Sequence, residues 1–307
     1  MSDLIRIGTM ITAPSKAEIK RMDVAAEMRS RPASEEDMCS YPAVLCQVGM
    51  PRRRTGEKVF ERRDGLVTLT MQVGKLRIEG KDTWQPLPYG PKPRLILATV
   101  TTIVKQTGKR FIPIGRTLRD FMRKMGLDPQ GSEYRSMRQQ MLALAACHMT
   151  ITDTIDGVDV TKQVGPISEF RCGMWGGTAD GEPAPWSEVQ EVSDKYFEYV
   201  MLHSVPLDER AIAGLRGSAL ALDIYAWLAH RLVRVRNPNG EVLPWNSLRV
   251  QFGQEYGRAD SFRQEFRSAL MDVRAYYQDA RIAEVKKGIQ IWESKPPIPK
   301  RGSHRAC

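Results

Sequence analysis

Hydrophobic and polar positions follow the same succession of patterns twice along the chain. Each copy holds a helical spacing of apolar residues, a short apolar run, two further helical patterns and an alternating stretch. The first copy predicts a helix over 94–106, a strand over 111–115, helices over 117–126 and 132–148, and a hairpin over 149–164. The second predicts a helix over 218–234, a strand over 241–244, helices over 245–253 and 259–278, and a hairpin over 281–292. This is the order of a winged helix, whose third helix usually enters the DNA major groove.

Turn and cap residues support these boundaries. Asp64-Gly65 is a two-residue turn between β-rich runs, and it predicts a further hairpin ahead of the first copy. Ser132 is a suitable N-cap for the long helix of the first copy. Asp156-Gly157 and Lys287-Gly288 are the turns expected at the tips of the two later hairpins.

The sequence therefore predicts an α+β protein with two winged-helix domains in tandem and a less ordered N-terminal segment. Between the two copies we expect a Gly-rich loop around Gly176-Gly177, a β-like run over 188–203 and a short helix near 206–215. The predicted division is a poorly ordered segment 1–50 with a helix-compatible stretch near 15–30, a first domain 51–170, a connecting segment 171–217, a second domain 218–293 and a disordered basic tail 294–307.

One helix carries a stripe of arginines. With about 100° of rotation per residue, Arg263, Arg267 and Arg274 fall on one narrow face of helix 259–278. Arginine can bond guanine O6 and N7 together, so Arg263 and Arg267 are candidates for base contacts and Arg274 for a phosphate contact. The predicted core face on the other side consists of Phe262, Phe266, Ala269, Leu270, Val273, Tyr276 and Tyr277. An isolated helix of this kind is more often a solvated basic face, and the winged-helix context reverses that preference in favour of DNA binding.

Further residues extend the candidate DNA interface. In the second copy they are Arg258, Gln264, and the wing-tip residues Lys286 and Lys287. On the matching helix of the first copy they are Ser132, Arg135, Ser136, Arg138 and Gln139. That helix could read bases, hold phosphates or contact another protein, and the sequence leaves these alternatives open.

Charge and cysteine usage narrow the class of protein. The chain has 46 Lys and Arg against 36 Asp and Glu, a net charge of +10, which favours a polyanionic partner such as nucleic acid. The five cysteines are irregularly spaced and form no CxxC pair, so reduced thiols are expected rather than a zinc site or a disulfide framework. No apolar run long enough for a membrane span and no signal-peptide pattern occur, so we expect a cytoplasmic protein.

Several stretches resemble the RepA-type replication initiators encoded by plasmids of Gram-negative bacteria. They are MPRRRTGEKVFERRDGLVTLTM (50–71), LPYGPKPRLILATVTT (87–102), IGRTLRDFMRKMGL (114–127), RQQMLAL (138–144), GSALALDIYAWLAHRL (217–232) and LPWNSLRVQFGQEYGR (243–258). The resemblance covers roughly residues 50–292 and implies two winged-helix domains that bind repeated origin sequences, called iterons. It also implies opening of adjacent DNA and recruitment of a host initiator and replicative helicase, with a monomer that binds iterons and a dimer that regulates.

The sequence also bears on two other functions. A winged-helix transcriptional repressor acting on a plasmid promoter fits the same residues, and the sequence does not separate it from an initiator. A nicking enzyme would need a tyrosine nucleophile and usually a pair of metal-binding histidines. His148, His203, His230 and His304 are too far apart to form such a pair, and no GxxxxGK[ST] loop is present. The sequence therefore predicts no catalytic residue, no metal site and no cofactor.

Overall fold

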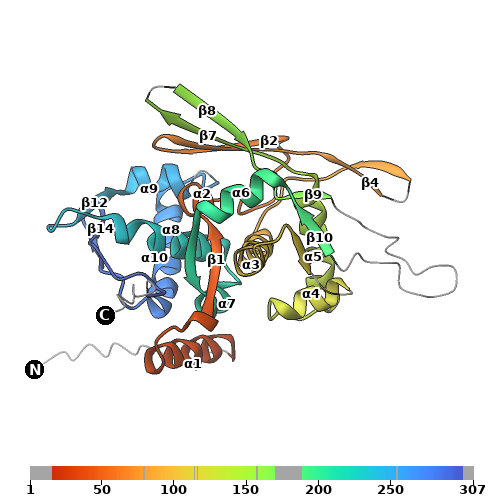
Figure 1. Cartoon of the computed structure of the whole chain (residues 1–307). Coiled ribbons are helices and arrows are strands. Elements are labelled where there is room, and N and C mark those ends of the chain that lie inside the picture. The colour runs from red at the N-terminus through yellow and green to blue at the C-terminus, as the bar shows by residue number, and fades with distance from the viewer. Residues whose placement is uncertain are drawn as a thin grey trace, which may run out of the picture.

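The computed structural model describes residues 16–78, 80–113, 115, 117–156, 158–169, 189–253 and 255–299. Helices are mixed with antiparallel sheets throughout this range, so the predicted α+β class is confirmed. Figure 1 shows long strands, β2 (Val59–Asp64), β7 (His148–Ile155) and β8 (Val158–Gln163), along one side of the molecule, and helix α1 (Lys16–Ser30) on the opposite side. Within the described residues, no helix is both long and apolar enough to cross a membrane.

The helices predicted for the first unit form close to their expected bounds. They are α3 (Pro91–Thr107), α4 (Leu118–Lys124) and α5 (Gly131–Ala146), and the strand between the first two is β6 (Phe111–Pro113). Proline at the first position of α3 removes an N–H that the first turn would leave unpaired, and α3 ends at Gly108 with a φ of 62°. The N-cap of α5 is Gln130 rather than the predicted Ser132, which lies inside the first turn.

The second unit also forms as predicted, with one shifted turn. Its elements are α8 (Ala219–Arg231), the 3-10 turn η2 (Leu232–Arg234), β12 (Glu241–Pro244), α9 (Trp245–Phe252), α10 (Ala259–Tyr276), β13 (Ile282–Val285) and β14 (Gly288–Ile291). The hairpin turns on Lys286 and Lys287, not on the predicted Lys287-Gly288, because Gly288 already pairs with Val285 and Pro244. A Cβ on Gly288 would lie 1.9 Å from the carbonyl oxygen of Leu243, so only glycine fits there.

The strands of the two units pair in the same order, but not through the hairpin expected in the first unit. The second sheet runs β12-β14-β13. In the first unit β6 pairs with β10 (Val189–Val192), which pairs with β9 (Ile167–Glu169), giving the matching order β6-β10-β9. The counterpart of the β13–β14 hairpin is therefore β9 with β10.

The hairpin predicted over 149–164 is real but belongs to another sheet. Its strands β7 and β8 continue the hairpin of β2 and β3 (Val67–Gln72), so that the sheet runs β2-β3-β7-β8. Leu69 and Ile151 are paired across β3 and β7, and both are buried. This shared apolar face explains why β7 joins β3 and leaves β6 to another partner. A further small sheet joins β4 (Lys75–Ile78) and β5 (Lys81–Trp84).

The prediction of a poorly ordered segment over 1–50 is wrong for its described part. The helix expected near 15–30 is α1, and it is followed by η1 (Glu35–Asp37), β1 (Met38–Pro42) and α2 (Ala43–Gln47). β1 pairs with β11 (Ser204–Asp208), and Val44, Leu45 and Cys46 are buried. The apolar run that makes this packing is too short to show a period in the sequence. Residues 1–15 lie outside the described residues.

The connecting segment and the tail are also more structured than predicted. The run 188–203 holds only the short strand β10 before it becomes helix α6 (Asp194–Leu202), which Ser193 caps by accepting a bond from the N–H of Tyr196 at 3.1 Å. The helix near 206–215 is α7 (Glu209–Leu215), preceded by β11. In the tail, Ser294 and Ile298 are buried, so disorder is wrong for 294–299. Gly176, Gly177 and residues 300–307 lie outside the described residues.

Buried charged side chains stand where the two units meet. We call this group the polar centre, and it consists of the buried Arg52, Arg62, Arg94 and Asp223 together with the partly buried Glu255. Nε and Nη2 of Arg94, on α3, donate to the two carboxylate oxygens of Asp223, on α8, at 2.6 and 2.8 Å. Guanidinium nitrogens of Arg52 and Arg62 lie 3.7 and 3.6 Å from the carboxylate of Glu255. The three arginines are 8%, 1% and 2% exposed, so each depends on these partners for compensation.

Backbone carbonyls complete the surroundings of Arg94. Its guanidinium donates to the carbonyl oxygens of Met50, Pro51 and Gly90 at 2.7, 3.2 and 2.6 Å. Burial alone would lower the pKa of Arg94, but Asp223 outweighs it and the pKa is raised. Four of the quoted sequence motifs, 50–71, 87–102, 217–232 and 243–258, thus meet in one place. The buried hydrophobic residues of both units likewise belong to one cluster.

Candidate nucleic-acid interface

Helix α10 has one buried and one exposed face, as the sequence predicts. All seven residues of the predicted core face, Phe262, Phe266, Ala269, Leu270, Val273, Tyr276 and Tyr277, are buried. On the other face Gln264, Arg267, Met271 and Arg274 are exposed, and the side chain of Arg263 is 39% exposed. The three arginines therefore share a solvent-facing strip of the helix.

Arg267 is held by side chains from two neighbouring elements. Its Nε and Nη2 donate to the same oxygen of Glu284, on β13, at 2.9 and 2.6 Å. Its guanidinium carbon lies 5.2 Å from the ring centroid of Trp245, the first residue of α9. The hydrogen bonds to Glu284 raise the pKa of Arg267. Both charged side chains remain about half exposed, at 48% and 47%, so the pair is reachable from solvent.

Arg263 has weaker contacts of the same two kinds. It lies 3.8 Å from the carboxylate of Asp260 and 6.0 Å from the centroid of Trp245. Arg258 is exposed at the N-cap of α10, where its carbonyl oxygen accepts the bond from the N–H of Phe262. Arg258, Arg263 and Gln264 therefore form the N-terminal end of the exposed strip, and Arg274 stands near its C-terminal end.

The hairpin beside α10 presents its lysines at the turn. Lys286 and Lys287 are both exposed, and the carbonyl oxygen of Lys287 accepts a bond from the N–H of Trp245 at 3.0 Å. That bond ties the hairpin turn to the start of α9. Trp245 itself is 6% exposed and packs edge-on against Phe266 of α10 at 5.9 Å. Trp245 thus joins α9, α10 and the hairpin, and three of the predicted second-unit residues, Arg263, Arg267 and Lys287, contact it.

The residues predicted on α5 form a separate surface. Ser132 and Arg135 are exposed, whereas Ser136, Arg138 and Gln139 are partly buried. Figure 1 shows α5 and α10 on different sides of α3. Helix α5 packs on α3, α4, β4 and β9, whereas α10 packs on α8, α7, α1 and α9. The structure therefore does not join the two predicted sets of residues into one site.

Two residues of the α10 site were missed by the sequence reasoning. Trp245 falls on a buried position of a predicted helix, where an aromatic residue indicates only packing. Glu284 is one acid in a short strand, and it meets Arg267 across 17 residues of chain. The hairpin pattern places Glu284 on the same strand face as Ile282, but nothing in the sequence shows which residue of α10 it faces.

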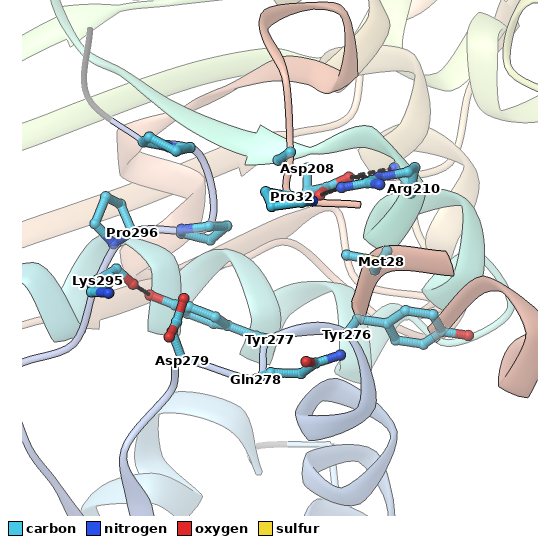
Figure 2. A pocket seen from close by; sticks show the side chains of 13 residues that line it. Met28, Pro32, Asp208, Arg210, Tyr276, Tyr277, Gln278, Asp279, Lys295 and Pro296 are labelled. Atoms are coloured by element: carbon cyan, nitrogen blue, oxygen red, sulfur yellow. Dashed lines mark hydrogen bonds and ion pairs between the residues drawn. The ribbon is translucent and has the colours of Figure 1, made fainter. Parts of the chain in front are cut away.

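A cavity beyond the C-terminal end of α10 is separate from the exposed arginine strip. It is lined by prolines and tyrosines, and Figure 2 shows the side chains of Tyr276 and Tyr277 pointing in opposite directions. Some of the polar groups on its wall are engaged with one another: Nη2 of Arg210 donates to Asp208 at 2.7 Å, and Tyr277 Oη donates to the carbonyl oxygen of Lys295 at 2.7 Å (Figure 2). This cavity does not contain the exposed arginines of α10.

Solved structures similar to this chain contain domains of RctB. A selenomethionine derivative of RctB domains 2 and 3 is 10% identical, with a TM-score of 0.50 over 83% of this chain and 99% of that chain. A further structure of RctB domains 2-3 is 11% identical, with a TM-score of 0.50 over 81% of this chain and 96% of that chain. At such identities the likeness shows a shared fold.

Comparison of the sequence with protein families identifies the family of the chain, which the structural likeness does not. No curated protein matches the chain significantly. A family model described as plasmid encoded RepA protein matches residues 87–247, which is more than half of the chain. The match includes α3, α5, α8 and the start of α9, and it contains four of the motifs quoted above in full. The chain therefore belongs to the family of plasmid-encoded RepA proteins, the RepA-type replication initiators.

Proposed function

We propose that this chain starts plasmid replication by binding direct repeats at the plasmid origin through two winged-helix units. The observation that carries the proposal is the exposed arginine strip of α10, set beside the lysine-tipped hairpin of the same unit. In a winged helix this is the third helix with its wing, the pair that contacts DNA. The matching strand orders β6-β10-β9 and β12-β14-β13 support a winged-helix assignment for both units.

In this proposal the two kinds of contact are divided along the strip. Arg263 and Arg267 read base edges in the major groove, where arginine fits guanine O6 and N7. Arg274, Lys286 and Lys287 hold phosphates and set the position of the helix. The net charge of +10 attracts the duplex before specific contacts form.

The first unit takes a second role. On α5, exposed Arg135 is suited to a phosphate contact, while partly buried Ser136 and Gln139 are less accessible to bases. We propose that α5 contributes affinity or joins a second copy of the chain. Host replication proteins, among them the host initiator and replicative helicase, then bind the assembled complex. The chain itself does not cut DNA in this scheme.

Footprinting tests the proposal directly. Purified full-length chain is added to the parent plasmid, and protection of direct repeats about two helical turns apart is expected. Protection of no repeated sequence would overturn the initiator function. A plasmid that carries only the origin, with the chain supplied in trans, then separates an initiator from a repressor. Replication of that plasmid supports initiation, whereas its failure to replicate favours repression.

A strand-scission assay tests the proposal that the chain does not cut DNA. Supercoiled origin DNA is incubated with the chain and a divalent cation, and the DNA should stay supercoiled and intact. A nicked product that depends on the chain would contradict the non-enzymatic proposal.

A further inference from the structure

Arg267, proposed to bind DNA, is paired with a carboxylate, that of Glu284. A carboxylate oxygen of Glu284 lies 2.6 to 2.9 Å from two of its nitrogens, so the charge of the guanidinium is largely neutralised locally. A neutralised cation is a poor phosphate ligand, because phosphate binding depends on net charge and counterion release. The contacts of Arg267 therefore favour a directional role over a general electrostatic one.

The geometry shows which donors of Arg267 stay free of Glu284. Nε and the inner hydrogen of Nη2 form one edge of the guanidinium, and both are used by Glu284. The end-on edge, made by Nη1 and the outer hydrogen of Nη2, is not engaged by that carboxylate. This edge has the spacing of a bidentate donor pair and matches guanine O6 and N7.

Trp245 contacts the same guanidinium from a second element. Its ring lies 5.2 Å from the guanidinium carbon, and the ring cannot move freely because it is 6% exposed and packed against Phe266. The N–H of Trp245 is also bonded to the hairpin turn at Lys287. Arg267 is therefore restrained by α9, α10 and β13 together, and less side-chain freedom is lost on binding.

We propose that Glu284 is a positioning residue, which with Trp245 presents the end-on edge of Arg267 to a guanine of the recognised repeat. This inference rests on the proposed binding of DNA by α10 and deepens it by naming the base. Glu284 touches no DNA in this arrangement. It acts through Arg267 and makes the unit more selective for one guanine, while its negative charge slightly weakens binding to DNA of any sequence.

The test measures sensitivity to one atom of the DNA. The probe is a duplex with the footprinted repeat, in which each guanine is replaced in turn by 7-deazaguanine, which lacks the N7 acceptor. For the wild-type chain, one replacement should weaken binding about 5- to 100-fold. Arg267→Ala should abolish the sensitivity at that guanine, and Arg267→Lys, which keeps the charge and a donor but lacks the planar fork, should reduce it.

Two substitutions at Glu284 separate positioning from charge. Glu284→Ala and Glu284→Gln remove the same negative charge, but glutamine keeps an acceptor for Nε and Nη2 of Arg267. We expect the sensitivity at that guanine to fall about 2- to 10-fold in Glu284→Ala and less in Glu284→Gln. Affinity for a random duplex should rise equally in both. Glu293→Ala is the matched control, because Glu293 is an exposed acid that pairs with Arg236 at 3.6 Å instead of with an arginine of α10.

The outcomes are distinguishable. Wild-type sensitivity in both Glu284 variants would overturn the positioning role, as would equal loss in the two variants, which would indicate charge alone. Retained sensitivity in Arg267→Ala would show that Arg267 does not read the guanine. Failure of the proposed function appears elsewhere, as absence of any protected repeat in the footprint of the wild-type chain.

Discussion

At the scale of single residues, the proposed function assigns base contacts and phosphate contacts to different arginines of the exposed strip of α10. Arg263→Ala should weaken binding to the repeat by about 1–3 kcal/mol and barely change binding to a random duplex. Arg274→Ala should weaken both duplexes about equally and reduce the salt slope by about 1. Titrations of both duplexes over a range of salt concentrations measure this difference. Unchanged affinity in both variants would mean that the strip is only a solvated face.

A second prediction at this scale concerns pH. Burial, together with Arg234 and Arg231, lowers the pKa of His230 on α8 to about 4. In the unfolded chain His230 is therefore protonated below about pH 6.5, whereas in the folded chain it becomes protonated only below about pH 4. Stability should fall as the pH drops through this window, by less than about 1.4 kcal/mol per pH unit because His230 is partly exposed.

Urea unfolding at about pH 7 and about pH 5 measures that effect. The loss of unfolding free energy between the two conditions should be smaller in His230→Gln than in the wild type. His148→Gln, at an exposed histidine of β7, is the control and should keep the wild-type loss. An identical loss in His230→Gln would show that His230 is not the group that titrates.

Residues of the core were predictable where their burial follows a local period. The apolar face of α10 is visible in the sequence because helical rotation alone places its seven residues together. The partners of Arg267 were not predictable, since Glu284 and Trp245 reach it only after α9, α10 and the hairpin have packed. Arg52 and Arg62 likewise appear in the sequence only as part of the 50–71 motif, and only the fold shows that they are buried.

At the scale of elements, the β12-β14-β13 sheet depends on one glycine. A Cβ at Gly288 would collide with the carbonyl group of Leu243, and no flexible side chain could move aside. Gly288→Ala should therefore lower the free energy of unfolding by roughly 1–3 kcal/mol, and it should displace the Lys286-Lys287 turn. Thermal unfolding measures the loss. Gly257→Ala is the control, because a Cβ there would meet nothing within 4 Å.

Long helices were predictable at this scale, whereas strand partners were not. The helices of both units appear within a few residues of their predicted bounds because their periods are long and their caps are local. β1 and β11 are five residues each and pair across more than half of the chain, so neither carries its own signal. The hairpin β7–β8 was predicted, but its attachment to β3 depends on a shared buried face that no local pattern reveals.

At the scale of the whole molecule, the polar centre makes the two units depend on each other. Arg94 comes from the first unit and Asp223 from the second, and both are almost fully buried. The carboxylate of Asp223 also lies 3.8 Å from Nη1 of Arg52. Loss of this one carboxylate would leave two buried guanidinium groups with too little negative charge around them. Burial and the neighbouring Arg52 already lower the pKa of Arg62 to about 10, so positive charge at Arg62 is disfavoured even with Asp223 in place.

Asp223→Asn should therefore be among the most damaging single changes in the chain. We expect a loss of about 3–5 kcal/mol of unfolding free energy, measured by denaturant titration, because an uncompensated charge stays buried. Glu198→Gln, in an exposed pair with Lys195, is the control and should change stability by less than about 1 kcal/mol. The double change Arg94→Met with Asp223→Leu should be less damaging than Asp223→Asn, because it removes the charge together with its partner. If Asp223→Asn unfolded at the wild-type denaturant concentration, the polar centre would not hold the two units together.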